Sequence, residues 1–483
     1  MRGFDGRRTV PARASAHGPD QSATAAPEET GRSFLSFDFG PPNLSFTDPL
    51  HFFGRGTMAT VHAHSQTVPV QRPKGRLWRY LAVAGPGLIV AFADTEAGSI
   101  TTAATSGAQF GMKLVLLQLL LIVPLFVVQE MTVRLGTVTG QGHAQLIRRH
   151  YGLAWTWVSL GTMLVTNLAA LVTEFIGVAG AALVFGLPVA PIVVICATVL
   201  IGIALSGRYR RAEVFALALC LLELLFIPAA IVAHPDPGAL IREGLFGSQP
   251  LGNRDYLLLV AGNIGAVIMP WMIFYQQSAT VDKGLTPLDL PLSRLDTAIG
   301  AVLTQVIMVA VVVTCAATLF VNHISISDAA HAALALVPLT GSRFAGIAFG
   351  AGLLGAALLG ALVVSLATSW AFGEAFAWRC SLNASCFEAK RFYGMYMLMV
   401  AAAAGIVLVP HLPLIRITVW VEAFNAFVLP IVLGFLLVMA NDRKILGDRV
   451  NSALGNTVAI AVAVVCVGLG LWMGFLTITG QAG

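Results

Sequence analysis

The chain has little charge. Only 11% of its 483 residues are Asp, Glu, Lys or Arg, while 57% are hydrophobic and the mean hydropathy is +0.80. Soluble domains carry about 25% charged residues, and a water-soluble fold of this length has too little interior to bury such an apolar excess. The composition therefore excludes a soluble protein. It predicts an all-α polytopic membrane protein, with the lipid bilayer as its solvent.

Several chemical signatures are also missing. The sequence contains no G-x-x-x-x-G-K phosphate-binding loop, no H-E-x-x-H metalloprotease motif and no other cluster of catalytic type. We therefore expect neither an enzyme nor a nucleotide-driven machine, and no bound cofactor. The six cysteines have no metal-type spacing and lie mostly in apolar runs, where buried inert thiols are usual.

The first 75 residues differ from the rest. Residues 1–75 are polar, rich in Ala, Pro and Ser and without hydrophobic periodicity, so they are predicted to be a disordered cytoplasmic segment. They lack the continuous apolar region of a signal peptide. Met58 is an alternative to Met1 as the start of translation. Residues 76–483 are expected to form the transmembrane domain.

Apolar stretches of about 20 residues predict helices that cross the membrane. The short connection at 185–188 predicts a tight hairpin between the third and fourth of these. Eleven spans are expected, near 80–106, 113–133, 153–184, 188–206, 212–233, 257–281, 296–321, 344–374, 393–410, 418–440 and 454–479.

The basic residues predict the orientation of these spans. With a cytoplasmic N-terminus, eighteen Lys and Arg near the spans face the cytoplasm and five face outside: Lys113, Arg242, Arg254, Arg343 and Arg416. Such a bias follows the positive-inside rule, and the odd number of spans puts the C-terminus outside. The formal net charge of +5 is then an orientation signal, so no nucleic-acid partner is expected.

Two of the expected spans are interrupted. Asp94, Glu96 and Gly98 interrupt the first, and Gly265 and Pro270 interrupt the sixth. Backbone groups freed in this way are tolerated in lipid only where they line a cavity or meet a ligand. Two breaks five spans apart are typical of LeuT-like transporters, whose 5+5 inverted repeat binds substrate between broken helices 1 and 6. Simple kinks are the alternative.

The residues at the two breaks suit a divalent metal ion as substrate. Glu96 offers anionic oxygen, Ser99 a hydroxyl, Ala266 a backbone carbonyl and Met269 a thioether. Oxygen ligands suit Mg²⁺ and Mn²⁺, and a thioether favours softer first-row ions. Because a buried carboxylate is costly unless it is paired, a doubly charged cation is the natural partner.

The same residues resemble the NRAMP family of divalent metal transporters. Family members carry Asp-Pro-Gly-Asn in the first helix and Met-Pro-His-Asn in the sixth, where this chain has EAGS (96–99) and MPWM (269–272). The segments GAQFG (107–111), RLGTVTG (134–140) and NDRKILGD (441–448) are also similar. The resemblance implies a secondary transporter that moves Mn²⁺, or Fe²⁺, into the cytoplasm by alternating access, coupled to protons, with no oligomer required.

Three positions depart from the family. Trp271 replaces a histidine associated with proton movement, Leu171 replaces a proton-accepting aspartate, and Lys283 replaces an arginine on the proton path, whereas Glu174 keeps the family's glutamate. These departures resemble an NRAMP-related branch that carries Mg²⁺ without proton coupling, and this alternative stays open. So does a different small-solute carrier of the same fold.

Other polar residues are weighed in the same way. Glu422 and Asn425 lie three residues apart on one predicted helical face, as a further ligand or as interhelical hydrogen bonds. Asp94 is expected to cap the half-helix that follows it, with direct ligation of the metal as the alternative. Glu130 and Glu223 stand near span ends or can pair with loop arginines, so a structural role is expected for both. Four histidines are expected in solvated loops: His143, His150, His323 and His331.

A non-transporting membrane sensor is the rival from another class. Plant ethylene-signalling proteins with an NRAMP-like domain append a long soluble tail, whereas four residues follow the last predicted span here. This difference favours the transporter.

Overall fold

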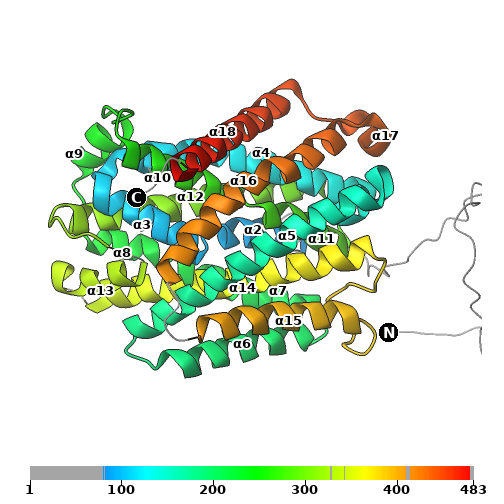
Figure 1. Ribbon diagram of the computed structural model, residues 1–483, viewed down its shortest axis with the longest axis horizontal. Helices are drawn as coiled ribbons and strands as arrows, with labels where there is room; N and C mark the ends of the chain where they lie inside the picture. The colour runs from blue at the N-terminus through cyan, green and yellow to red at the C-terminus, as the bar shows by residue number, and fades with distance from the viewer. Residues whose placement is uncertain (1–79, 81, 327–328, 342, 410–413, 479–483) are drawn as a thin grey trace, which may run out of the picture. The chain divides into compact units, whose positions relative to one another are not determined.

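The computed structural model of the protein describes residues 80, 82–326, 329–341, 343–409 and 414–478 (Figure 1). All of these belong to one compact unit, His62–Gly483. The segment 1–75 and the alternative start at Met58 lie outside the described residues. The regular secondary structure of the described residues is entirely helical, as predicted.

The first repeat begins with a broken helix. Its two halves are α2 (Pro86–Ala93) and α3 (Ala97–Phe110), and α3 is followed by a 3₁₀ turn, η1 (Gly111–Leu114). The remaining helices of the repeat are α4 (Val115–Thr139), α5 (His143–Val184), α6 (Val189–Leu205) and α7 (Tyr209–Glu223), which α8 (Phe226–Val232) continues after a two-residue turn.

The second repeat also begins with a broken helix, made of α10 (Arg254–Val267) and α11 (Pro270–Asp282). Short elements fill the connections, and α13 has no counterpart among the predicted spans. The other helices are α12 (Leu290–Cys315), α14 (Arg343–Ala375), α15 (Lys390–Val407), α16 (Leu414–Asn441) and α18 (Ala453–Ile478); the connecting elements include α9 (Pro237–Ala239), η2 (Leu240–Leu245), η3 (Ala316–Phe320), α13 (Ala329–Thr340), α17 (Arg443–Leu446) and η4 (Gly447–Arg449).

Two glycines bend the chain at α5, one inside the helix and one just after its end. Gly152 interrupts its helical backbone with φ 83° and ψ −174°, a conformation that only glycine adopts readily. The prediction that the third span begins at 153 agrees with this bend, but residues 143–151 are helical rather than a loop. At the other end, Gly186 has φ 67° in the turn to α6, which confirms the predicted hairpin.

The broken helices pack among long unbroken ones. α5 lies along α14, while α12 packs on α2, α3 and α4, and α11 contacts α4 and α14 (Figure 1). The approach of α3 to its neighbours is close. A Cβ atom at Gly107 would lie 2.3 Å from the Val312 carbonyl oxygen of α12, and one at Gly177 of α5 would lie 2.4 Å from the Ala97 Cβ. Small residues thus fix α3 between α5 and α12.

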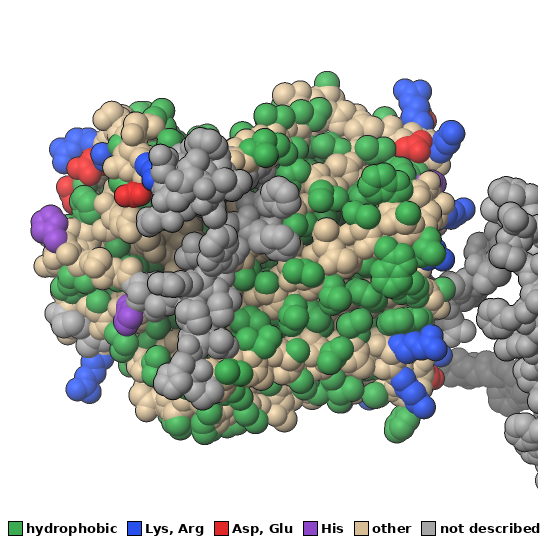
Figure 2. Space-filling model, in the orientation of Figure 1, with side chains coloured by type: hydrophobic (Ala, Val, Ile, Leu, Met, Phe, Trp, Pro, Cys, Tyr) green, Lys and Arg blue, Asp and Glu red, His purple; other side chains and the backbone are tan. Residues whose placement is uncertain are grey.

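The surface is apolar where lipid is expected. Figure 2 shows hydrophobic side chains across the middle of the visible face, with charged side chains gathered at its two ends. By length and hydropathy, six helices of the described residues can cross a membrane. The protein is therefore a multi-pass membrane protein, whereas eleven crossings and the positions of the termini stay predictions.

Candidate functional site

The first break exposes no charge to solvent. α2 stops at Ala93, Asp94 and Thr95 form a turn, and Glu96 is the extended N-cap residue of α3, with φ −58° and ψ 169°. All three residues of the break are buried, with Glu96 at 0% exposure. The N-terminus of a helix favours negative charge through its free N–H groups and its dipole. Glu96 therefore sits where a carboxylate is tolerated at this depth.

α12 satisfies both ends of the short helix α2. The Asp296 carboxylate accepts hydrogen bonds from the backbone N–H groups of Gly85 at 3.2 Å and Gly87 at 2.8 Å. At the other end, the Thr304 hydroxyl donates to the carbonyl oxygen of Ala91 at 2.5 Å. The helix ends that a break leaves open need such partners in lipid.

The second break follows from Pro270. α10 ends at Val267, and Met269 is extended, with φ −100° and ψ 147°, before Pro270 opens α11. The proline ring disfavours a helical conformation for the residue before it, while its own missing N–H is harmless at the first helical position. The last carbonyl groups of α10, including that of Ala266, therefore have no helical partner.

The two breaks meet. The Ser99 hydroxyl, in the first turn of α3, donates a hydrogen bond to the Ala266 carbonyl oxygen at 3.1 Å across 167 residues of sequence. Ser99, Ala266 and Met269 are all 0% exposed, like Glu96. Two of the four predicted ligands thus meet at a buried junction of broken helices, and the other two, Glu96 and Met269, each lie three residues along the chain from one of them.

Asn425 reaches this junction from α16. Its Nδ2 atom lies 3.6 Å from the Met269 sulfur atom, and the residue is 1% exposed. An amide on a third element beside the thioether fits either alternative that the sequence left open for Asn425. The side chain of Glu422 lies outside the described residues.

Glu174 holds the second half of the broken helix. Its Oε2 atom accepts a hydrogen bond from the backbone N–H of Ala97 at 3.3 Å, so a carboxylate of α5 contacts the first turn of α3. Gly360 of α14 makes room for it, because a Cβ atom there would lie 2.4 Å from Glu174 Oε1. The acid kept from the family thus touches the residue next to Glu96.

Asp94 does not cap α3, which corrects the prediction. Glu96 is the N-cap residue, and its side chain makes no capping hydrogen bond to that helix. The Asp94 Oδ2 atom instead accepts a hydrogen bond from Gln129 Nε2 of α4 at 3.1 Å. The turn at Asp94 and Thr95 directs the side chain toward α4 rather than back along the following helix. Sequence reasoning did not single out Gln129.

Trp271 and Lys283 lie at opposite ends of α11. Trp271 is 1% exposed within the apolar core. Lys283 follows the last turn of α11, and its Nζ atom donates to the Ala84 carbonyl at 2.6 Å and to Glu213 Oε1 at 2.5 Å. Lys283 therefore ties the end of α11 to the start of the first span and to α7.

Glu223 stands at the end of a helix, one of the two placements expected for it, and its partner is a hydroxyl rather than an arginine. It ends α7, is 0% exposed, and its Oε2 atom is bonded to the Thr95 hydroxyl in the first break. The signal was an acid inside an otherwise apolar run, where an ionisable group is functional by default. Its closeness to span 1 depends on tertiary packing.

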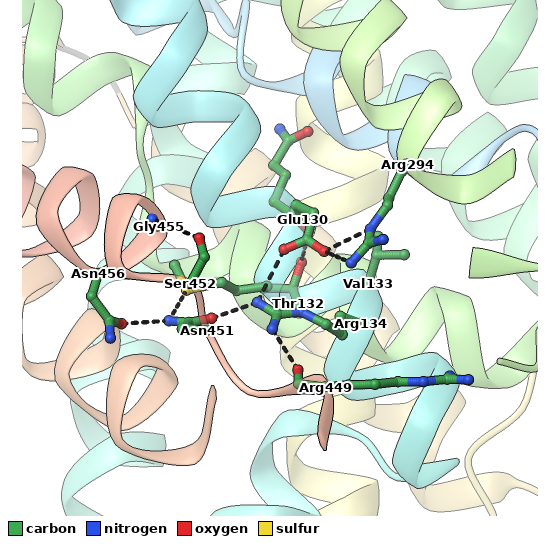
Figure 3. A network of polar contacts seen from close by, with 12 residues as sticks. Glu130, Thr132, Val133, Arg134, Arg294, Arg449, Asn451, Ser452, Gly455 and Asn456 are labelled. Atoms are coloured by element: carbon green, nitrogen blue, oxygen red, sulfur yellow. Dashed lines mark hydrogen bonds and ion pairs between the residues drawn. The ribbon is translucent and has the colours of Figure 1, made fainter. Parts of the chain in front are cut away.

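Glu130 does pair with arginines, at the far end of α4. Its carboxylate lies 3.1 Å from Arg134 Nη2 and 2.7 Å from Arg294 Nη2 of α12. Arg134 also donates to the Arg449 carbonyl at 2.6 Å and to Asn451 Oδ1 at 2.5 Å, so α4 and α12 are joined to the segment before α18 (Figure 3). This network joins helices, and none of its bonds involves a residue of the two breaks.

The prediction that His143 lies in a solvated loop is wrong. It is the first residue of α5, is 0% exposed, and its Nδ1 atom lies 3.0 Å from Gln277 Oε1. His150 and His331 are helical as well, but they and His323 are exposed, as expected. Its ring also packs edge-on against Phe274, so α11 covers His143.

The chemistry of the junction is that of a cation site. Among the described residues, no group of three His, Cys, Asp or Glu side chains is placed to hold a metal ion. The four predicted ligands offer one carboxylate, one hydroxyl, one backbone carbonyl and one thioether, and the carboxylates of Asp94, Glu174 and Glu223 lie at or beside the first break. Mixed oxygen and thioether ligands accept divalent ions.

Comparison with known proteins identifies the family of the chain. The family model of Natural resistance-associated macrophage protein-like proteins (Nramp) matches residues 87–476. The Divalent metal cation transporter MntH of Ralstonia nicotianae is 28% identical over 423 residues, which cover 84% of this chain and 93% of that protein. Both cover the two breaks.

Solved structures show the same fold. A manganese transporter of Eremococcus coleocola, in complex with an aromatic bis-isothiourea compound, superposes with a TM-score of 0.70 at 18% identity, covering 88% of this chain and 91% of that one. MhsT in complex with L-phenylalanine gives a TM-score of 0.53 at 16% identity, covering 80% and 97%. These likenesses confirm the LeuT-like arrangement with two broken helices.

Proposed function

Because this chain belongs to the Nramp family, whose members are transporters rather than enzymes, we propose that it moves divalent metal cations across a membrane by alternating access. Its relative MntH carries divalent metal cations by name. The proposed substrate is Mn²⁺, with Fe²⁺ as a second candidate. The metal is cargo, so the protein needs no resident cofactor.

One observation carries the proposal: the Ser99 hydroxyl meets the Ala266 carbonyl oxygen between the two breaks. The contact brings two oxygens from different half-helices within 3.1 Å of each other. A divalent ion that replaced this hydrogen bond would bind both oxygens, with the Glu96 carboxylate and the Met269 sulfur atom completing the set. Rocking of the half-helices would then open either side of the site, as in other transporters of this architecture.

Met269 favours Mn²⁺ over Mg²⁺. A thioether is a soft ligand that binds Mg²⁺ poorly, since Mg²⁺ prefers oxygen ligands and retains coordinated water molecules. The Met269 sulfur atom is buried beside Asn425 Nδ2 at 3.6 Å, so its position is defined. Trp271 and Leu171 favour Mg²⁺ instead, because they stand where the family has proton-handling side chains and the Mg²⁺-carrying branch lacks proton coupling. Mg²⁺ transport without proton coupling is therefore the alternative to transport of Mn²⁺ or Fe²⁺.

Glu174 is the proposed proton acceptor if protons are coupled. It is a buried acid that contacts the backbone N–H of Ala97, one residue from Glu96. Binding of a divalent cation at Glu96 would disfavour a proton on a nearby carboxylate by charge repulsion. With Lys283 engaged by Glu213, release of that proton would proceed along α5 rather than along α11.

Transport is proposed to run into the cytoplasm. The Nramp resemblance implies this direction. The predicted orientation, with a cytoplasmic N-terminus, an outer C-terminus and Lys and Arg concentrated on the inner side, then identifies the half-helices that face the cytoplasm. A single chain contains both breaks, so the proposed mechanism requires no oligomer.

Uptake by purified protein in liposomes tests the function. We expect Mn²⁺ entry to be at least tenfold slower with Glu96→Ala, while Glu388→Ala, which removes a half-exposed acid from a loop ion pair, stays within twofold of the unmodified protein. Uptake by Glu96→Ala at the normal rate would refute the proposed site. Parallel recording of internal pH, with Mg²⁺ as competing substrate, separates proton-coupled Mn²⁺ entry from Mg²⁺ flux at steady pH.

A further inference from the structure

A second buried carboxylate lies at the first break. Asp94 is 1% exposed, and its Oδ2 atom is bonded to the neutral amide of Gln129. Among the atoms that the structure describes, its Oδ1 atom has no hydrogen-bond partner. A charge at this depth is costly unless a cation neutralises it, and a neutral amide does not do so. Asp94 therefore lacks the partner that its charge requires.

Asp94 and Met272 converge on the side-chain amide of Gln129. The Nε2 atom of Gln129 lies 3.1 Å from Asp94 Oδ2 and 3.8 Å from the sulfur atom of Met272 in the first turn of α11. Gln129 and Met272 are both 0% exposed. Within the described part of the chain, Gln129 Oε1 also has no hydrogen-bond partner. Three elements thus present a carboxylate, an amide and a thioether to one small volume.

This set differs from the first one in its place along the broken helices. Glu96, Ser99 and Ala266 belong to the start of α3 and the end of α10. Asp94 and Met272 belong instead to the end of α2 and the start of α11. In the predicted orientation α3 and α10 are the outer halves, and α2 and α11 are the inner halves. The second set is therefore one step closer to the cytoplasm.

We propose that Asp94, Gln129 and Met272 form a second site for a divalent first-row cation, occupied in transit between the site at Glu96 and the cytoplasm. The proposal rests on the proposed function for the direction of travel, but not for the binding itself. One hard anionic oxygen, one neutral oxygen and one thioether suit Mn²⁺, Fe²⁺ and the softer Cd²⁺ better than Mg²⁺.

Small movements suffice to form the site. Metal–oxygen distances in proteins are about 2.1 Å, so the side chains around Gln129 Nε2 must close by roughly 1 Å. A half-turn of the amide presents Oε1 to the ion in place of Nε2, since the two atoms occupy equivalent positions on the side chain. The hydrogen bond between Asp94 and Gln129 then holds the carboxylate in place between passages of the ion.

Cd²⁺ binding to the purified full-length protein, measured by isothermal titration calorimetry, tests the proposal. In a Glu96→Gln background, which weakens the first site, we expect measurable Cd²⁺ binding to remain. Adding Asp94→Asn or Met272→Leu is expected to weaken it by at least a further tenfold. Met308→Leu, a matched change at a buried methionine of α12 that is 1% exposed, is expected to weaken it by less than twofold.

The choice of ion gives an independent readout. Met272→Leu conserves volume and removes only the thioether, so Cd²⁺ affinity should fall while Mg²⁺ affinity stays within twofold. Gel filtration establishes that each variant is folded, and Met272→Leu keeps the test valid if Asp94→Asn does not fold. No Cd²⁺ binding by Glu96→Gln, or equal binding with and without Met272→Leu, would overturn the second site.

The two proposals fail in different ways. If Glu96→Ala transports Mn²⁺ normally, the proposed function of the first site is wrong, whatever happens at Asp94. If Glu96→Ala abolishes transport but Asp94→Asn and Met272→Leu leave Cd²⁺ binding in the Glu96→Gln background unchanged, only the second site is wrong.

Discussion

A methyl group at residue 360 should displace Glu174 from the broken helix. In Gly360→Ala, the new Cβ would lie 2.4 Å from Glu174 Oε1 and 2.6 Å from its Cδ, where ordinary contacts begin about 1 Å further out. The carboxylate must therefore move, and its hydrogen bond to the Ala97 N–H is the bond in its path.

The expected magnitude follows from three terms. Loss of a hydrogen bond to a charged group costs about 1.5–3 kcal/mol, and overpacking of a core costs about 1–3 kcal/mol when it is not relieved. Replacing glycine by alanine within a helix returns up to about 1 kcal/mol. Because side-chain movement relieves most of the overpacking, we expect Gly360→Ala to be less stable by about 1–3 kcal/mol.

Thermal unfolding in detergent measures this change. Gly394→Ala in α15 is the matched control, because nothing lies within 4 Å of a Cβ atom there, and it should be neutral or stabilising. Glu174→Asp, one methylene shorter, should recover part of the lost stability when combined with Gly360→Ala, whereas Glu174→Gln should not. Equal stability of the Gly360→Ala and Gly394→Ala proteins would refute the proposed role of Glu174 as an anchor of α3.

Three further predictions concern the two broken helices. Gly107→Ala would place a Cβ atom 2.3 Å from the Val312 backbone oxygen, so expression of folded protein should fall sharply, and recovery of normal yield would contradict the close packing of α3 on α12. Met269→Leu should lower Mn²⁺ affinity by about tenfold with little change for Mg²⁺; equal losses for both ions, measured by competition in liposomes, would count against thioether ligation. Lys283→Met leaves the partly buried Glu213 carboxylate unpaired, so it should destabilise the protein by up to about 3 kcal/mol, the low end of the cost for a fully buried pair, and the double variant with Glu213→Leu should recover stability in a denaturation assay.

Local chemistry made much of the fold predictable. Long apolar runs predict helices, and the positions of Glu96 and Pro270 predict the two breaks, because a carboxylate and a missing N–H are hard to place inside an unbroken membrane helix. Four ligand types could then be named from the residues beside the breaks. The meeting of Ser99 with Ala266 agrees with that reasoning.

Contacts between helices could not be predicted in the same way. The partner of Asp94 is Gln129, on another helix, and nothing in the local sequence distinguishes this glutamine from a polar residue that faces a neighbour. Glu223 shows the same limit, because its position in the sequence does not reveal that its partner is Thr95. His143 was expected in solvent because its contacts with Phe274 and Gln277 are made by another helix, α11, and leave no signature beside the histidine in the sequence.

The most direct test of the central claim is the position of a bound Mn²⁺ ion in a crystal of the full-length protein, located by its anomalous scattering. The account predicts a peak about 2.2 Å from the Glu96 carboxylate, bordered by Ser99, the Ala266 carbonyl and the Met269 sulfur atom, that disappears in Glu96→Ala. A fully occupied Mn²⁺ peak that lies away from both breaks, or that persists unchanged in Glu96→Ala, would contradict it.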